Sequence, residues 1–78
     1  MRNKKTDLTK KFGWKVKIER TKQKLSQEQL ADRAELNKNT LGLIERGECT
    51  PSIETANDIA KALNLSLIEL IDVDRINF

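Results

Sequence analysis

Two short helical patterns separated by only three residues constrain the fold of this chain most, and both lie within residues 26–47. The first opens with Ser26 and Gln29, whose side chains can each accept a hydrogen bond from the other residue's backbone N–H. This capping box predicts a helix over residues 27–34. The connection that follows, Glu35 to Asn37, is therefore a tight turn.

The second pattern has a start signal and a stop signal of its own. Asn37 is a favourable N-cap residue, and Gly47 is typical of the position just beyond a last helical turn, so we expect a helix over residues 38–46. Leu41 and Ile44 lie three residues apart and share one face of it. Two helices joined by so tight a turn form a helix-turn-helix.

Composition excludes several classes of protein. At 78 residues the chain is one small domain. The single cysteine, Cys49, cannot form an internal disulfide, and without histidine there is no Cys/His metal cluster, so we expect no metal and no cofactor. A chain without histidine or paired carboxylates also lacks a general acid or base, so we expect no enzyme. No apolar run is long enough for a membrane span or a secretory signal, which predicts a cytoplasmic protein.

Charge is unevenly distributed along the chain. Residues 1–24 carry ten Lys or Arg and two acidic residues, a net charge of +8, whereas residues 25–78 carry five basic and ten acidic residues, a net charge of −5. A polyanion is therefore expected to approach the first helix and the basic positions of the helix at 38–46. On charge alone, the alternative is that the lysines only keep the N-terminus soluble.

The segment before the helix-turn-helix divides into an arm and a first helix. Residues 1–8 lack apolar periodicity and are expected to form a flexible basic arm. Residues 8–22 fit either a half-buried strand or a helix, and we prefer the helix because the following unit needs support and no partner strand is apparent. Such a helix has two apolar sides, and we expect the rest of the domain to cover both. They are formed by Leu8, Phe12 and Val16 and by Trp14 and Ile18.

Two further helices are expected after Gly47. Ser52 caps the first of them, with Thr55 at its third position, and Asn64 is a plausible left-handed stop. Ser66 and Glu69 form a second capping box for a short helix from 67 to about 71. The expected fold is therefore all-α, with a helix-turn-helix domain of five helices. The arm, the domain and an apolar C-terminal tail comprise residues 1–8, 9–71 and 72–78.

Four features of the sequence occur together: Ser26-Gln27 with Leu30-Ala31, the segment Ile44-Glu45-Arg46-Gly47, Pro51 five residues after Arg46, and the final segment from Ala62 to Leu67. With these features, residues 12–71 resemble the phage-repressor (Xre/Cro-like) helix-turn-helix family. The resemblance implies a five-helix, repressor-like domain that binds double-stranded operator DNA as a two-fold dimer. Two residues depart from the family pattern, because Glu35 replaces a common turn Gly and Leu43 replaces a common polar base-reading residue.

The second helix of a helix-turn-helix lies in the major groove, and its N-terminal residues reach base edges. This places Lys38 and Asn39 as base contacts, because Lys can donate to guanine and Asn can pair with adenine. Leu43, one turn further along, is a candidate contact with a thymine methyl group. The alternatives are a solvated helix start for the first two residues and extra core for Leu43.

Phosphate contacts follow from helix ends and from charge. Gln27 heads a helix whose free N–H groups favour an anion, and its alternative role is to extend the cap. Thr40 and Arg46 flank the base-reading face and suit phosphates. Weaker candidates, which would not discriminate between sequences, are Lys10, Lys11, Lys15, Thr50 and Ser52.

Arg20 and Glu45 are charged residues on otherwise inward-facing stripes. The resemblance implies that they form a structural salt bridge between the first helix and the helix at 38–46, and breaking a buried pair of this kind costs roughly 3–5 kcal/mol.

The apolar residues near the C-terminus carry more apolar surface than a small monomer readily buries, so they are candidate dimer contacts. They are Leu67, Leu70, Ile71, Val73, Ile76 and Phe78. The Trp14/Ile18 side of the first helix is a second candidate surface. The alternative is a tail that folds back on its own core.

The first interpretation is a transcriptional regulator, a repressor, that binds a pseudo-palindromic operator as a homodimer with recognition helices about 34 Å apart. The second is a DNA-binding antitoxin or restriction-modification controller with a protein partner. The third is a protein-interaction domain that does not bind DNA, and Lys38, Asn39 and Arg46 argue against it.

Overall fold

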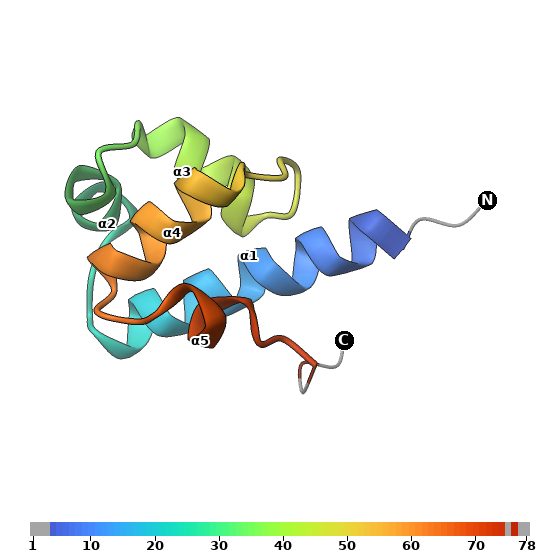
Figure 1. Ribbon diagram of the computed structural model, residues 1–78. Coiled ribbons are helices and arrows are strands. Elements are labelled where there is room, and N and C mark those ends of the chain that lie inside the picture. The colour runs from blue at the N-terminus through green and yellow to red at the C-terminus, as the bar shows by residue number, and fades with distance from the viewer. Residues whose placement is uncertain (1–3, 75, 77–78) are drawn as a thin grey trace.

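The computed structural model describes residues 4–74 and 76, and these residues form five helices and no strand. The helices are α1 (Lys4–Lys22), α2 (Gln27–Ala34), α3 (Lys38–Glu45), α4 (Ile53–Ala62) and α5 (Leu67–Ile71) (Figure 1). The prediction of an all-α, five-helix domain is confirmed. None of these helices combines the length and the apolar character that a membrane crossing requires.

The first helix begins earlier than the sequence suggested. α1 starts at Lys4, so the prediction of a flexible arm is wrong for residues 4–8, while residues 1–3 lie outside the described part of the chain. A helix that is already nucleated extends through a polar segment at little cost, and Asp7 in its first turn interacts favourably with the positive end of the helix dipole.

The helix starts agree with the capping residues of the sequence. Ser26 accepts a hydrogen bond from the Gln29 N–H at 3.0 Å, and the Gln29 side chain accepts one from the Ser26 N–H at 2.8 Å. The Asn37 side chain accepts from the Thr40 N–H at 3.1 Å and so begins α3. Ser66 and Glu69 form the second reciprocal box. Helix positions in this domain are therefore set largely by local hydrogen bonds.

Left-handed residues end the helices and turn the chain. Glu35 (φ 59°), Gly47 (φ 74°) and Asn64 (φ 61°) follow α2, α3 and α4. Glu35 adopts this conformation at a cost of roughly 1 kcal/mol, because its Cβ crowds the backbone. The N–H of Leu36 donates to the Ala31 carbonyl at 2.8 Å and closes the turn of the helix-turn-helix.

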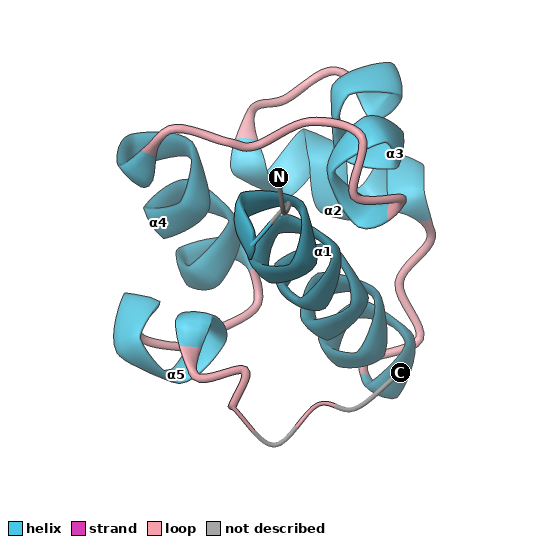
Figure 2. Ribbon diagram, turned by 90° about the vertical axis from the view of Figure 1, so that its right-hand side faces the viewer, coloured by secondary structure: helices cyan, strands magenta, loops and turns pink. Residues whose placement is uncertain are grey.

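α1 supports the rest of the domain. Figure 2, which looks roughly along α1, shows α3 on one side of it and α4 and α5 on the other. α1 packs against α3 and α5, while α2 packs against α3 and α4. Seven large side chains at the centre are fully buried: Val16, Leu30, Leu41, Ile44, Ile59, Leu63 and Leu70.

The prediction that α1 is covered on two sides is wrong. Phe12 and Val16 are buried, but Trp14 is 43% exposed and Leu8, assigned to the buried stripe, is 59% exposed. The neighbouring helices pack on the side that carries Phe12 and Val16, and they leave Trp14 in solvent.

Two of the predicted dimer contacts are instead part of the core. Leu70 is 0% and Val73 is 4% exposed, because the chain after α5 folds back on the domain. Leu67 is half-buried against the same core. Ile71 is exposed, Ile76 is half-buried, and Phe78 lies outside the described residues.

Gly13 sets the distance between α1 and α3. A Cβ at this position would lie 2.2 Å from the Ile44 carbonyl oxygen and 2.8 Å from that of Glu45. Both atoms belong to the backbone of α3 and cannot rotate away. The two helices therefore approach closely only because residue 13 has no side chain.

We predict that Gly13→Ala destabilises the domain by about 1–3 kcal/mol, since α1 and α3 must separate to admit the methyl group. Gly42→Ala is the matched control in α3, because a Cβ there meets first the movable end of the Arg46 side chain, at 3.1 Å. This control should be neutral or stabilising by up to about 1 kcal/mol, as expected for Gly→Ala in a helix. Urea unfolding measures both, and equal effects would contradict the close-packing argument.

Candidate nucleic-acid interface

The N-terminal half of α3 presents polar side chains to solvent. Lys38 and Asn39 are exposed in the first turn. Together with Gln27, Gly42 and Arg46 they line an open recess of about 410 Å³. Gly42 is buried at this recess, and a Cβ there would lie 3.1 Å from the Arg46 guanidinium and 3.8 Å from the Gln27 amide oxygen.

Leu43 and Thr40 flank this face. Leu43 is half-buried, and it is not one of the partly buried hydrophobic side chains that pack against the core. Its surroundings therefore do not favour a role in the core. Thr40 is half-buried, and its backbone N–H is bound to the Asn37 cap. α3 ends at Glu45, one residue earlier than predicted, with Arg46 as its C-cap.

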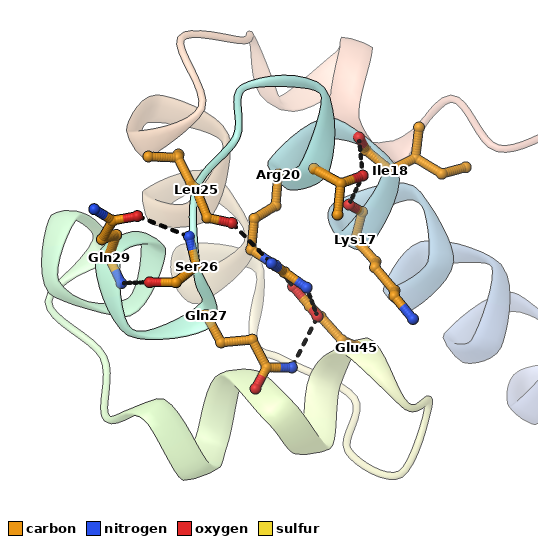
Figure 3. Close-up of polar contacts among 9 residues, drawn as sticks. Lys17, Ile18, Arg20, Leu25, Ser26, Gln27, Gln29 and Glu45 are labelled. Atoms are coloured by element: carbon orange, nitrogen blue, oxygen red, sulfur yellow. Dashed lines mark hydrogen bonds and ion pairs between the residues drawn. The ribbon is translucent and has the colours of Figure 1, made fainter.

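The inner side of α3 is fixed by an ion pair with α1. Arg20 Nε donates to Glu45 Oε2 at 2.7 Å, and Arg20 Nη2 donates to Oε1 at 3.1 Å (Figure 3). The two side chains are only 11% and 2% exposed. The salt bridge that the family resemblance implied is therefore present, in the bidentate geometry that gives such pairs their directional strength.

The same pair reaches the start of α2. Arg20 Nη1 donates to the Leu25 carbonyl at 2.8 Å, just before the Ser26 cap. Gln27 Nε2 donates to Glu45 Oε1 at 3.0 Å. Figure 3 shows these bonds converging on one point between α1, α2 and α3. Gln27 is thus not part of the cap, and its amide ties the first turn of α2 to α3.

The weaker phosphate candidates do not gather on one surface. Lys10 lies against Gly47, beside the end of α3. Thr50 shares a hydrogen bond of 2.9 Å with Thr9, and the Ser52 hydroxyl accepts the Thr55 N–H as the cap of α4. Lys11 is half-buried on α1.

Lys15 lies on another side of α1, near α5. The pKa of the Glu69 carboxyl is lowered mainly by hydrogen bonds from the Ser66 backbone and side chain, with a smaller coulombic contribution from Lys15. A helix turns by about 100° per residue, so Lys15 lies on the α5 side of α1, away from the face that carries Lys10 and Lys17, and we do not place it with the phosphate contacts.

Sequence reasoning missed two residues that lie beside α3. Lys17 Nζ is 5.6 Å from the centre of the Trp14 ring. Both residues line a second recess together with Lys10, Gln27, Glu45, Arg46 and Glu48. The spacing of Lys10, Trp14 and Lys17, at i, i+4 and i+7, could have revealed their common face.

Arg46 carries an ion pair of its own. Its Nε lies 3.1 Å from Glu48 Oε2, and both side chains are about half exposed, at 54% and 55%. An exposed pair of this kind contributes little to stability, so Arg46 can exchange its partner easily. Within the described residues, no group of three or more His, Cys, Asp or Glu side chains is arranged to hold a metal ion.

Comparison with known proteins gives consistent matches. A family model described as helix-turn-helix, HTH_3, matches residues 16–70. The immunity repressor protein of Bacillus phage phi105 is 36% identical over 59 residues, which cover 76% of this chain and 41% of the phage protein. The chain thus spans about two fifths of that relative's length.

Two solved structures are also similar. The restriction-modification controller protein C.AhdI from Aeromonas hydrophila is 38% identical, with a TM-score of 0.78, over 82% of this chain and 96% of that chain. The apo form of the competence regulator ComR from Streptococcus vestibularis is 40% identical, with a TM-score of 0.78, over 91% of this chain and 24% of that chain.

We predict that Glu45→Ala costs roughly 3–5 kcal/mol of unfolding free energy, because it leaves the Arg20 guanidinium buried without its partner. Lys22→Ala, which removes the exposed Lys22–Glu19 pair at 3.4 Å, is the control and should cost less than about 1 kcal/mol. Urea unfolding of both variants gives the comparison. A loss at Glu45 no larger than that at Lys22 would show that the pair does not hold the helices together.

Proposed function

The chain belongs to the HTH_3 helix-turn-helix family of DNA-binding transcriptional regulators, and from this membership we propose that it is a repressor that binds a pseudo-palindromic operator as a two-fold dimer. The family is non-enzymatic, in line with the expectation from composition. The observation that carries the proposal is the exposure of Lys38 and Asn39 on a helix whose opposite side is held by the Arg20–Glu45 pair.

α3 is the helix that enters the major groove in this proposal. Lys38 donates to O6 and N7 of a guanine, and Asn39 pairs with N6 and N7 of an adenine. Leu43 contacts a thymine methyl group. The recess that Lys38 and Asn39 line with Gln27 and Arg46 supports this placement.

Phosphates on either side of the groove are bound by residues around α3. Gln27 offers an anion the free N–H groups at the start of α2, while its amide stays bound to Glu45. Arg46 pairs with Glu48 through Nε, so its Nη groups can bind a phosphate oxygen while that pair stays in place. Thr40 in the first turn of α3 and Lys10 beside the end of α3 contribute on either side. Lys11, Thr50 and Ser52 remain weaker candidates.

The repressor role is supported by the phage immunity repressor among the relatives. The dimer is supported by the general rule that helix-turn-helix proteins bind two half-sites as two-fold dimers. A two-fold dimer places its two α3 helices about 34 Å apart, one turn of duplex. Of the residues predicted as dimer contacts, Ile71 stays exposed on α5. We propose that Ile71 and the half-buried Ile76 contribute to this contact.

A restriction-modification controller is the second candidate function. It is favoured by the similarity to C.AhdI, which extends over 96% of that protein's length. The position of the operator separates the two functions, because we expect it beside restriction-modification genes if the chain is such a controller.

We predict that the purified chain enriches a pseudo-palindromic sequence from a library of random duplexes, with half-sites one helical turn apart. Each protomer presents one α3 helix, so the spacing of the half-sites follows from the dimer. Sequencing of the bound fraction tests this, with a library bound in about 1 M salt as the background. Enrichment of a single half-site alone would contradict the dimer, and absence of any enrichment would contradict base readout.

We predict that Asn39→Ala lowers affinity for the selected duplex by about 1–3 kcal/mol while its affinity for a scrambled duplex is unchanged, because only the base contact is lost. Lys61→Ala, an exposed lysine in the last turn of α4, is the control and should leave both affinities unchanged. Fluorescence anisotropy with labelled duplexes measures the dissociation constants of the parent chain and of both variants for each duplex. Equal losses on both duplexes would assign Asn39 to the phosphates instead.

A further inference from the structure

Beside the base-reading face lies the second recess, of about 490 Å³, whose floor and walls come from three helices and the loop after α3. α1 contributes Lys10, Trp14 and Lys17, which share one face of that helix. In Figure 3 the Lys17 side chain points from α1 toward the side on which α3 lies. The recess is therefore formed by the packing of α1 against α3, and no single helix forms it alone.

The charges around this recess do not cancel. The Glu45 carboxylate is already bound by Arg20 and Gln27, and Glu48 is paired with Arg46. Lys10 and Lys17 are exposed, and neither takes part in an ion pair found among the described residues. The recess thus offers two positive charges that have no carboxylate partner there.

Trp14 fixes where one of these charges sits. The Lys17 ammonium lies 5.6 Å from the centre of its ring, within the range of a cation–π contact. A lysine side chain is otherwise a long flexible stem, so the ring favours positions of the Lys17 charge beside Trp14, which lines the recess. This gives the exposed tryptophan a role that packing does not explain.

The recess is continuous with the base-reading face, because Gln27 and Arg46 line both. An α-helix with its side chains is about 10–12 Å across and fills a major groove about 12 Å wide. Groups directly beside α3 therefore meet the phosphates that border the groove.

We propose that this recess binds a backbone phosphate of the duplex at the edge of the groove that α3 enters. Lys17 and Lys10 supply the positive charge, and Trp14 is a positioning residue for Lys17. The inference rests on the proposed DNA-binding mode and extends it with a contact that reads no base. Its effect is therefore equal on every sequence and appears in the salt dependence of binding.

The test compares Lys17→Gln with Lys15→Gln, a neighbour on the opposite side of the same helix, toward α5. Affinity for the selected and the scrambled duplex is measured from about 50 to about 200 mM salt. Lys17→Gln should make the negative slope of log K against log salt shallower by about 0.9. The loss of affinity across that range should therefore be roughly 3-fold smaller than for the parent chain. Lys15→Gln should keep the slope of the parent chain.

Two further variants separate charge from shape. Lys17→Arg keeps the charge and should keep the slope. Trp14→Leu should reduce the affinity less than Lys17→Gln does, since the ammonium is freed but not removed. Thermal unfolding of each variant, followed by circular dichroism, confirms that the fold is intact.

Trp14 is also the single tryptophan of the chain and reports directly on the recess. Adding duplex to the parent chain should change its fluorescence, and the change should saturate with binding. An unchanged slope for Lys17→Gln, or unchanged emission at saturating duplex, overturns the inference. A slope change without any preference for the selected duplex overturns the operator proposal alone, whereas a parent chain that binds no duplex overturns both.

Discussion

The bidentate pair between Arg20 and Glu45 is the interaction on which the arrangement of this domain depends. It joins three helices at one point, because Arg20 also holds the Leu25 carbonyl and Glu45 also accepts from Gln27. A buried pair costs desolvation energy, so its value lies in geometry more than in net stability. Gly13 lets the backbones come close enough for the pair to form, and α3 is thereby held at one distance and one rotation relative to α1.

Much of this fold could be predicted from the sequence, because the signals are local. Ser26 with Gln29, Asn37, and Ser66 with Glu69 each satisfy N–H groups within one turn, so their effect does not depend on the rest of the chain. The start of α1 was not predicted, since a polar first turn carries no periodic signal. The close approach at Gly13 depends on how two helices cross and has no local signature either.

The surface was harder to predict than the core. Leu70 and Val73 are apolar residues near the C-terminus, and their sequence alone does not tell whether they pack within one chain or between two. The lysines of α1 present the same difficulty. Lys15 and Lys17 are two residues apart and similar in sequence context, yet one lies on the α5 side of α1 and the other lies near the Trp14 ring beside α3. The rotation of α1 decides between them, and that rotation is set by its packing on α3.

α3 divides its residues sharply between two tasks. Leu41, Ile44 and Glu45 face inward and hold the helix, while Lys38 and Asn39 are exposed and touch none of the core. Substitutions at the outward positions therefore leave folding almost unaffected. A duplicated copy of such a gene could diverge in target preference through one or two changes, without first acquiring compensating mutations elsewhere. The separation of the two faces makes the scaffold readily evolvable.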